Sequence, residues 1–336
     1  MEKPVFDTKQ TQRLLIVCFA LLRDVAMALP TVYSFARQNP DIEVDVLTLP
    51  AFKRIFINAP SNVWVLKADF RGRNSGLLGL LRLAFGLRKR GYNAVADWQN
   101  DWRSRLIASL LRIGGVRTAA TESAVCLQKR LLSTRQPLRP AAERYADVLR
   151  VLGLSVELRF KSVFAEGESV ATPIEIADPA VGFAPFAPTK SQTLPLQTTL
   201  NVVQRMAEWG WNVYLFGTEA DKATLDEWAS QTENTVSLAG KYALDEQIAM
   251  MSKLDLMVAM DSSMQHLASI AGTRVVSVWG STTPVGGSLG YGQRTDDAVC
   301  RQLPCQPCSL NGIRGDCHLR YACLNQIDIN DLMKKI

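Results

Sequence analysis

The chain has 336 residues, of which 47% are hydrophobic and 21% are charged. This composition excludes a disordered or fibrous protein, and the length allows two ordinary domains with large cores. The formal charge of +6 mildly favours an anionic partner such as a phosphate, a nucleic acid or an acidic lipid surface. A solvated surface with no special partner explains that charge equally well.

In chain order, short β-branched apolar runs alternate with helical patterns, which is typical of parallel sheets covered by helices on both faces. The first half contains four strand candidates, at 13–20, 43–50, 62–68 and 94–99. Helices are predicted near 24–38, 75–90, 101–112 and 141–154. The segment 155–179 mixes Gly, Pro, Ser and Glu without a period, and we interpret it as a linker.

The same alternation restarts after the linker. Strands are predicted at 181–187, 212–217, 235–240, 256–261 and 274–280, and helices at 195–209, 220–230, 244–253 and 263–271. We therefore predict an α/β protein with one domain at 1–160, a second at 175–325 and a C-terminal helix at 326–336. In such sheets, ligands bind beyond the carboxyl ends of the strands.

The N-terminal stretch is polar where a signal peptide needs an apolar run. No segment approaches the roughly 18 uncharged apolar residues of a membrane span. From these two observations we expect a soluble, cytoplasmic protein.

The stretch "LDLMVAMDSSMQHLASIAG" at 254–272 predicts a buried strand that ends at Asp261 and a helix that begins near Ser263. A helix start presents backbone N–H groups without partners and the positive end of the helix dipole, which together suit a diphosphate. Small side chains at Ser262 and Ser263 would let a phosphate approach the backbone. The alternative is that Asp261 or Ser262 simply caps the helix. His266 lies in the first turn of this helix, where the sequence favours a packed core residue and a ligand contact about equally.

Three further residues stand where polar groups can meet a ligand. Asp24 lies between the first strand and its helix, where it could take a proton from an attacking hydroxyl or serve as a helix cap. Lys190 follows the first strand of the second half and could offset charge on a leaving phosphate, although an exposed loop lysine is the commoner case. Thr283, in a Ser/Thr-rich turn, could reach a phosphate or a sugar, and a plain loop would look similar.

Several common site motifs are absent from the sequence. There is no phosphate-binding G-x-x-x-x-G-K-[ST] loop, and the glycine run at 286–292 lacks the spacing of a dinucleotide fingerprint. No D-x-D pair exists to hold a divalent cation on a diphosphate. Only two histidines occur, which argues against a metal–histidine enzyme or a Ser-His-Asp triad.

Five of the seven cysteines crowd between 300 and 323. The spacing Cys305-x2-Cys308-x8-Cys317-x5-Cys323 contains one tight pair, and four thiolates could hold a structural zinc. The second pair is wider than in zinc ribbons, and free thiols in a compact loop explain the pattern equally well.

The stretch "SGLLGLLRLAFGLRKRGY" at 75–92 is a basic, apolar helical pattern. It is typical of a helix that covers a sheet and ends in cations that suit its dipole. The alternative is contact with an anionic membrane at Arg88, Lys89 and Arg90.

Taken in order, these stretches resemble the glycosyltransferase family that includes the lipopolysaccharide heptosyltransferases. "MDSSMQHLASIAGTRVVSVWGSTTP" is similar to the family's nucleotide-binding signature, "D-[ST]-G-x-x-H-x-A-x-x-x-G-x-P". "LLIVCFALLRDVAMALP" resembles its first strand and catalytic-aspartate turn, and "DWQNDWRS" its "D-x-Q-G-x-x-R-S" segment. "LPCQPCS" matches a cysteine-bearing segment of many members.

The resemblance implies the GT-B fold, with two Rossmann-like domains facing a central cleft, an acceptor-binding first domain and a donor-binding second domain. It implies inverting, metal-independent transfer of a heptose from ADP-heptose to a lipopolysaccharide core or related lipid-linked glycan, with peripheral contact at the cytoplasmic face of the inner membrane. Asp24 would be the general base, and Lys190 would stabilise the leaving diphosphate. The donor would be bound by six residues: Glu219, Asp261, Ser262, Ser263, His266 and Thr283.

The sequence departs from the family pattern at three places. Arg23 stands where a glycine usually precedes the aspartate, Ser263 replaces the signature glycine, and "KSQT" lacks the Trp that often follows Lys190. These departures motivate two alternatives: a non-catalytic sugar-nucleotide-binding homologue and a transferase with another donor sugar. Nucleic-acid binding is disfavoured because no basic patch interleaved with aromatic residues is present.

Overall fold

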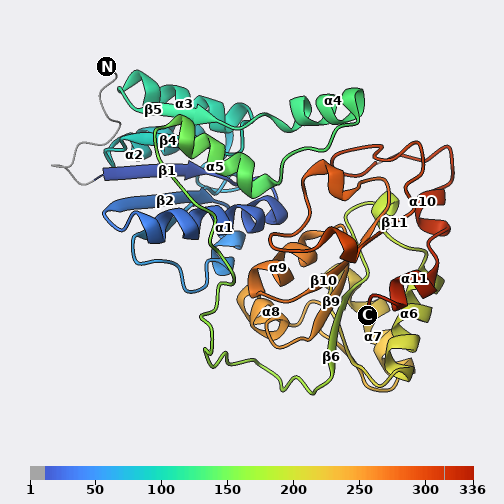
Figure 1. The fold of residues 1–336 in the computed structure, drawn as a ribbon. Coiled ribbons are helices and arrows are strands. Elements are labelled where there is room, and N and C mark those ends of the chain that lie inside the picture. Colours follow the sequence, from blue (N-terminus) through green and yellow to red (C-terminus); the bar gives the residue numbers. More distant parts are fainter. Residues whose placement is uncertain (1–11, 314) are drawn as a thin grey trace. The chain divides into compact units, whose positions relative to one another are not determined.

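Two parallel β-sheets, each with its own core, divide the chain into two units (Figure 1). The computed structural model describes residues 12–313 and 315–336. Unit 1 comprises Met1–Leu127 and Arg139–Phe160, and unit 2 comprises Gln128–Leu138 and Lys161–Ile336. The two units are described one after the other below.

The sheet of unit 1 has five parallel strands in the order β3-β2-β1-β4-β5. Their bounds are β1 Gln12–Val17, β2 Ile42–Thr48, β3 Val63–Lys67, β4 Ala94–Asp97 and β5 Arg117–Ala120. Ile16 in the central strand pairs with Val46 of β2 on one side and Ala96 of β4 on the other. The strand order reverses direction between β1 and β4, which is where ligands bind in open α/β sheets.

Helices cover both faces of this sheet. They are α1 (Leu22–Gln38), α2 (Gly76–Arg88), α3 (Trp102–Ile113) and α5 (Ala141–Val151), with the short η1 (Pro50–Ile55) in a connection. The helix α4 (Ala124–Thr134) begins in unit 1 and belongs to unit 2 from Gln128 onward. Because side chains alternate along a strand, Leu15 and Val17 of β1 share one core with Leu80 of α2 and Ile107 of α3. On the other face, α1 and α5 pack against each other.

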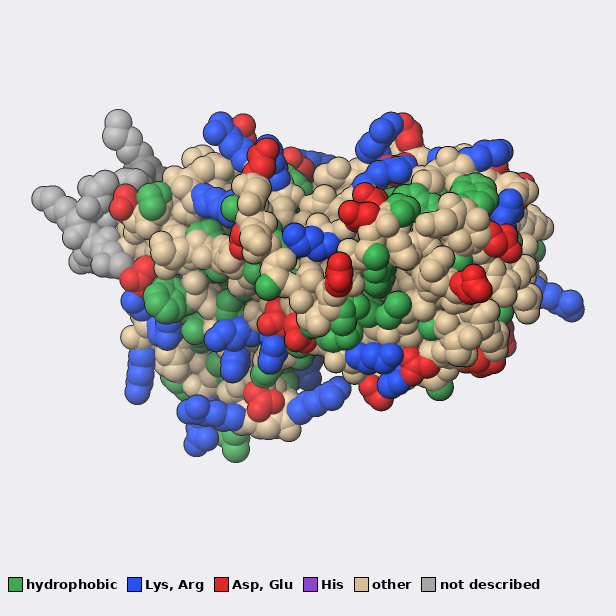
Figure 2. All heavy atoms as spheres, turned by 90° about the horizontal axis from the view of Figure 1, so that it is seen from below, with side chains coloured by type: hydrophobic (Ala, Val, Ile, Leu, Met, Phe, Trp, Pro, Cys, Tyr) green, Lys and Arg blue, Asp and Glu red, His purple; other side chains and the backbone are tan. Residues whose placement is uncertain are grey.

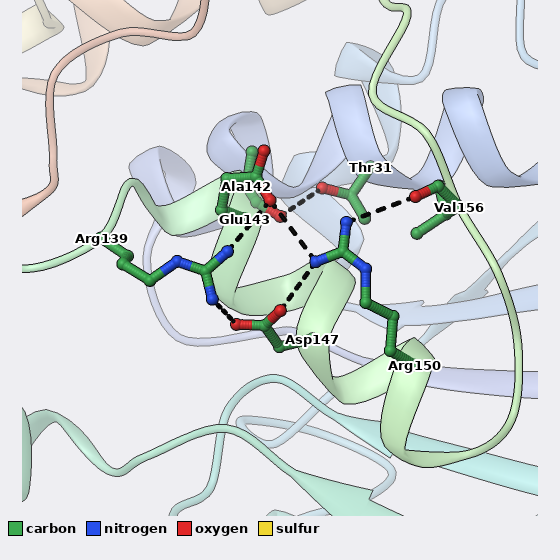
Figure 3. A network of polar contacts seen from close by, with 7 residues as sticks. All are labelled: Thr31, Arg139, Ala142, Glu143, Asp147, Arg150 and Val156. Carbon is green, nitrogen blue, oxygen red and sulfur yellow. Dashed lines mark hydrogen bonds and ion pairs between the residues drawn. The ribbon is translucent and has the colours of Figure 1, made fainter.

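Polar contacts hold α5 in place on unit 1 (Figure 3). The buried hydroxyl of Thr31 on α1 donates a 3.0 Å hydrogen bond to the carbonyl of Ala142 at the start of α5. On the outer side of α5, Asp147 pairs with Arg139 and, at 2.7 Å, with Arg150. The charged side chains are about half exposed, so their pairs contribute little stability and the buried bond fixes the helix position.

The sheet of unit 2 has six parallel strands in the order β11-β10-β9-β6-β7-β8. Their bounds are β6 Ala180–Ala184, β7 Asn212–Leu215, β8 Thr235–Ser237, β9 Leu256–Met260, β10 Val275–Trp279 and β11 Ala298–Cys300. Gly182 of β6 pairs with Met257 of β9. A Cβ at Gly182 would lie 2.5 Å from Leu254 Cδ1 and 2.6 Å from Met257 Sδ, so any larger residue would force these packed side chains to move.

The helices of unit 2 are α6 (Leu196–Glu208), α7 (Lys222–Gln231), α8 (Leu244–Met251), α9 (Ser263–Ala271), α10 (Ala322–Asn325) and α11 (Ile329–Met333). One core joins Phe183 of β6 and Val258 of β9 to Val203 of α6 and Leu332 of α11. This core fixes the carboxyl ends of β6 and β9, between which the strand order of this sheet reverses.

The α/β prediction is confirmed, and every predicted strand is present with small differences at its ends. The stretch interpreted as a linker, 155–179, carries neither helix nor strand. Two strands were not predicted, β5 and β11, because each is an edge strand of only four or three residues. Of the predicted C-terminal helix 326–336, only Ile329–Met333 is helical. In the described part of the chain, every helix is too short or too polar to cross a membrane.

Candidate functional site

The tip of α9 is built by the junction of β9 with that helix. β9 is fully buried and ends at Met260, and α9 begins three residues later. Ser262 is the N-cap, and its hydroxyl accepts a hydrogen bond from the backbone N–H of Met264 at 3.4 Å. The other N–H groups of a first turn have no acceptor within the helix, so the tip is suited to bind an anion.

Asp261 lies behind this tip and is only 1% exposed. Its carboxylate accepts hydrogen bonds from Gln192 Nε2 at 2.7 Å, the Thr282 hydroxyl at 2.6 Å and Gln265 Nε2 at 3.0 Å. These donors come from η2 (Lys190–Gln192), from the turn after β10 and from α9. Asp261 therefore joins three segments that are distant in sequence and holds the helix tip in position.

Replacing Asp261 with Ala should destabilise unit 2 by about 3 kcal/mol, because it leaves buried donors without an acceptor. Urea unfolding followed by circular dichroism measures this loss. Asp296→Ala is the control, since that carboxylate is exposed and its ion pair with Arg294 is 3.5 Å long. Equal stability of the two variants would contradict the anchoring role of Asp261.

A pocket of about 230 Å³ opens beside the tip of α9. Four of its residues are large and apolar: Phe186 and Pro188 follow β6, Phe216 follows β7, and Met264 lies in the first turn of α9. The pocket therefore lies at the carboxyl ends of β6, β7 and β9. Its apolar wall is suited to a flat ring such as a nucleobase.

The polar residues of the same pocket are Ser262 and Ser263 at the helix tip and Thr218 and Asp221 after β7. Asp221 Oδ2 accepts hydrogen bonds from the Thr218 N–H at 2.8 Å and from the Thr218 hydroxyl at 2.7 Å. In return, the Asp221 N–H donates a 3.0 Å hydrogen bond to the Thr218 carbonyl, and together these bonds fix the turn that carries Asp221. The pocket thus combines an apolar wall, a carboxylate and a helix tip, which together match a base, a ribose and a phosphate.

The other site residues predicted in the second half of the chain do not line this pocket, and they differ in how exposed they are. Lys190 is exposed at the start of η2, two residues before the Gln192 that bonds to Asp261. Glu219 is exposed at the start of η3 (Glu219–Asp221), next to Gly240, and does not line the pocket. His266 and Thr283 are buried, at 1% and 8% exposure, and neither lines the pocket.

The second predicted group, on unit 1, surrounds Asp24 in the first turn of α1. The Asp24 side chain is 25% exposed, and Arg23 Nε lies 3.4 Å from its Oδ1. Burial raises the pKa of this carboxyl, and the charges of Arg23 and Arg144 lower it. A carboxylate with a raised pKa and partial exposure is suited to act as a base.

The turn that presents Asp24 is supported from β4. Gln99 Oε1 accepts hydrogen bonds from the backbone N–H groups of Phe19 at 3.2 Å and Ala20 at 2.9 Å. Asp97, at the end of β4, accepts a 2.9 Å bond from the Ser104 hydroxyl, which ties the start of α3 to the strand. The "DWQNDWRS" segment therefore supports the turn that holds Asp24.

The residues packed near Asp24 include two buried aromatic rings and a protonated thiol. Trp98 stacks on Tyr145 with 4.7 Å between ring centroids, and both rings are buried. The Cys18 thiol is also buried, and burial raises its pKa, as do the carboxylates of Asp24 and Asp97. Cys18 therefore stays a neutral thiol and does not supply a second base.

The cysteine cluster near the C-terminus contains protonated thiols. Burial raises the pKa of Cys308 to about 12, with further contributions from Cys305, Cys323 and Cys317. Burial likewise raises the pKa of Cys323 to about 11. Across residues 12–313 and 315–336, no three His, Cys, Asp or Glu side chains are placed so that they could hold a metal ion.

Comparison with known proteins agrees with this geometry. Residues 80–314 match the family described as Glycosyltransferase family 9 (heptosyltransferase), which is more than half of the chain. The chain belongs to glycosyltransferase family 9. It is 24% identical over 322 residues to lipopolysaccharide heptosyltransferase 1 of Pseudomonas aeruginosa, covering 88% of this chain and 86% of that protein.

Solved structures of family 9 members share its fold. The glycosyl transferase family 9 protein from Veillonella parvula superposes with a TM-score of 0.73 at 17% identity, covering 100% of this chain and 97% of that chain. The Escherichia coli heptosyltransferase WaaC with ADP-2-deoxy-2-fluoro heptose gives 0.65 at 18% identity, covering 90% and 96%. The predicted GT-B fold is confirmed, and the chain is a glycosyltransferase of this α/β type.

Three groups of residues in the candidate site were not predicted from the sequence. They are the apolar wall (Phe186, Pro188, Phe216, Met264), the anchors of Asp261 (Gln192, Thr282, Gln265) and the support of the Asp24 turn (Gln99). The signal for the wall was present, because Phe186 and Phe216 lie at the carboxyl ends of two predicted strands, 181–187 and 212–217. The anchors carry no local signal, since two of them lie 69 and 21 residues from Asp261.

Proposed function

We propose that this protein transfers a heptose from ADP-heptose to a lipopolysaccharide core or a related lipid-linked glycan. The observation that carries the proposal is the pocket of unit 2, in which a helix tip with Ser262 and Ser263 adjoins an apolar wall. The named relative, lipopolysaccharide heptosyltransferase 1 of Pseudomonas aeruginosa, supports the choice of donor and acceptor class. The acceptor places the reaction at the cytoplasmic face of the inner membrane.

In this proposal, the pocket of unit 2 binds the donor. The adenine lies against the apolar wall formed by Phe186, Pro188 and Met264, and the diphosphate accepts hydrogen bonds from the N–H groups at the tip of α9. Asp221 is the residue best placed to meet the ribose hydroxyls, with Glu219 farther out in the same turn. Lys190 would offset charge on the leaving ADP.

Unit 1 supplies the acceptor side of the reaction. Asp24 takes the proton from the acceptor hydroxyl, whose oxygen bonds to the anomeric carbon while the bond to the diphosphate breaks. A single displacement of this kind inverts the configuration at the anomeric carbon, and none of its steps requires a metal. Proton NMR of the first-formed product tests the stereochemistry, because a retained configuration would exclude the direct displacement.

Arg23 should keep Asp24 ionised. In Arg23→Gly, burial still raises the pKa of Asp24, while one of the two guanidinium groups that lower it is gone. The base must be ionised to accept a proton, so the acidic limb of kcat/KM should move to higher pH and activity should fall most at low pH. A pH profile from about pH 5 to about pH 9 measures this shift.

Arg23→Lys is the matched control for that experiment, because a lysine restores the positive charge near the carboxylate. An acidic limb at the same pH in all three proteins would show that Arg23 does not act on Asp24. Loss of activity at every pH in Arg23→Gly would instead indicate a structural role.

A second candidate function is a non-catalytic sugar-nucleotide-binding protein. The 3.4 Å contact between Arg23 and Asp24 favours it, because a cation beside the base can occupy the place of an acceptor hydroxyl. A thermal-shift screen with ADP-heptose, ADP-glucose and UDP-sugars identifies the donor, since ligands of the folded state raise its stability. Transfer of radiolabelled heptose to an acceptor excludes this second candidate, and ADP-heptose binding without transfer supports it.

We also propose a structural zinc at Cys305, Cys308, Cys317 and Cys323, which crowd in one segment; binding it requires these side chains to rearrange, because no three of them converge in the described structure. Its role would be to hold that segment, with no part in the transfer step. Metal analysis of the purified protein by plasma mass spectrometry tests it, and less than one zinc per ten chains would contradict it.

A further inference from the structure

The helix α2 presents an apolar face that no described residue covers. Leu77, Leu78 and Phe85 are 59%, 83% and 53% exposed. On the opposite side of the helix, Leu80, Ala84 and Leu87 are buried against the sheet of unit 1. The helix is therefore apolar on both sides, which its role as a cover for the sheet does not require.

Lys and Arg residues flank this outer face of α2, whereas Asp and Glu are absent from the same stretch of sequence. Residues 70–93 contain six Lys and Arg and no Asp or Glu. Arg90 is paired with Asp45 at 2.9 Å. The other cations are all exposed: Arg71, Arg73, Arg82, Arg88 and Lys89. Figure 2 shows one face of the molecule, on which several Lys and Arg side chains gather at the lower left.

The apolar and basic side chains lie on the same stripe of the helix. Leu78, Arg82, Phe85 and Lys89 follow one another at spacings of four, three and four residues, which places them along one side of an α-helix. Long Arg and Lys side chains at such positions can reach headgroups while the apolar groups enter the acyl boundary. A surface of this kind matches the interface of an anionic bilayer in both charge and polarity.

We propose that the outer face of α2, with Leu77, Leu78 and Phe85 and the flanking cations, docks on an anionic phospholipid bilayer. The inference rests on the proposed function in one respect, because a lipid-linked acceptor requires the enzyme to work at a membrane surface. A second copy of this chain fits the face poorly. A two-fold contact would place the five cations of one face against the same five of the other.

Vesicle co-sedimentation of the full chain tests the proposal. The probes are vesicles of phosphatidylcholine alone and vesicles with about 30% phosphatidylglycerol. Binding should require the anionic lipid and weaken as salt is added, because salt screens the headgroup charges. Equal binding to both kinds of vesicle, or no binding to the anionic ones, would overturn the proposal.

Two double variants locate the surface. Arg82→Gln with Lys89→Gln should weaken binding to anionic vesicles about twenty-five-fold, at about fivefold per cation. Leu78→Ser with Phe85→Ser should weaken it about tenfold through lost apolar insertion. All four side chains are exposed, so both variants should fold, and thermal unfolding checks this.

The controls are matched changes at exposed positions of unit 2: Lys253→Gln with Arg301→Gln, and Leu196→Ser with Leu319→Ser. These should leave vesicle binding unchanged, and a loss equal to that of the α2 variants would overturn the assignment to α2. Sedimentation velocity examines the competing partner, since a dimer that Leu78→Ser with Phe85→Ser dissociates would overturn docking on lipid. None of these measurements uses the donor, so failure of heptose transfer and failure of membrane docking are distinguishable.

Discussion

Asp24→Asn is expected to lower kcat for sugar transfer about a thousandfold, because an amide cannot accept the proton of the acceptor hydroxyl. Asn has nearly the same size as Asp, so the turn that Gln99 supports should remain folded. The donor pocket lies within unit 2, and donor affinity measured by calorimetry should therefore be unchanged. Initial rates at saturating donor and acceptor measure the effect.

The matched control for this experiment is Asp41→Asn, which removes an exposed carboxylate from the same unit. Its turnover should equal that of the unaltered protein. If Asp24→Asn also keeps full turnover, Asp24 is not the base, and another group must accept the proton. If donor affinity falls together with turnover, Asp24 contributes to binding rather than to proton transfer.

Ser263→Glu is expected to weaken donor binding about a hundredfold, because it places a negative charge at the helix tip where the diphosphate is expected. The same charge should not harm the fold. A carboxylate at the start of a helix interacts favourably with the helix dipole, so the thermal midpoint should stay the same or rise. Ser263 is half-buried at the edge of the pocket, which leaves room for the longer side chain.

Ser263→Gln separates the effect of charge from that of size. It has the shape of the Glu variant without the charge, and its donor affinity should fall much less. Calorimetric titration with ADP measures both variants. Equal affinity of the Glu and Gln proteins would show that no phosphate lies at the tip of α9.

The parts of the fold that depend on local pattern could be predicted from the sequence. The helix at 263–271 has the predicted bounds, because a buried strand, a capping serine and an apolar helical pattern follow one another without interruption. The central strands β1, β6 and β9 were predictable for the same reason. The edge strands β5 and β11 were not, since four and three residues with half-exposed side chains carry too little signal.

In the candidate site, too, residues with a local sequence signal could be predicted, and contacts that depend on the strand order could not. Ser262 and Ser263 line the pocket as their position after a strand suggested, although their roles in binding stay predictions. The partners of Asp261 depend on the strand order, which brings η2 and the turn after β10 to one point. A sequence read alone gives no strand order. The ion pair between Arg23 and Asp24 likewise depends on side-chain direction at the start of α1.

The three donors around Asp261 have a consequence for how donor preference can change over time. They hold the tip of α9 from beneath, whereas Phe186 and Pro188 of the apolar wall follow β6 and have no part in those bonds. If the donor binds as proposed, substitutions at Phe186 should alter which base is accepted and leave the diphosphate site intact. Base preference and phosphate binding would then be able to change independently.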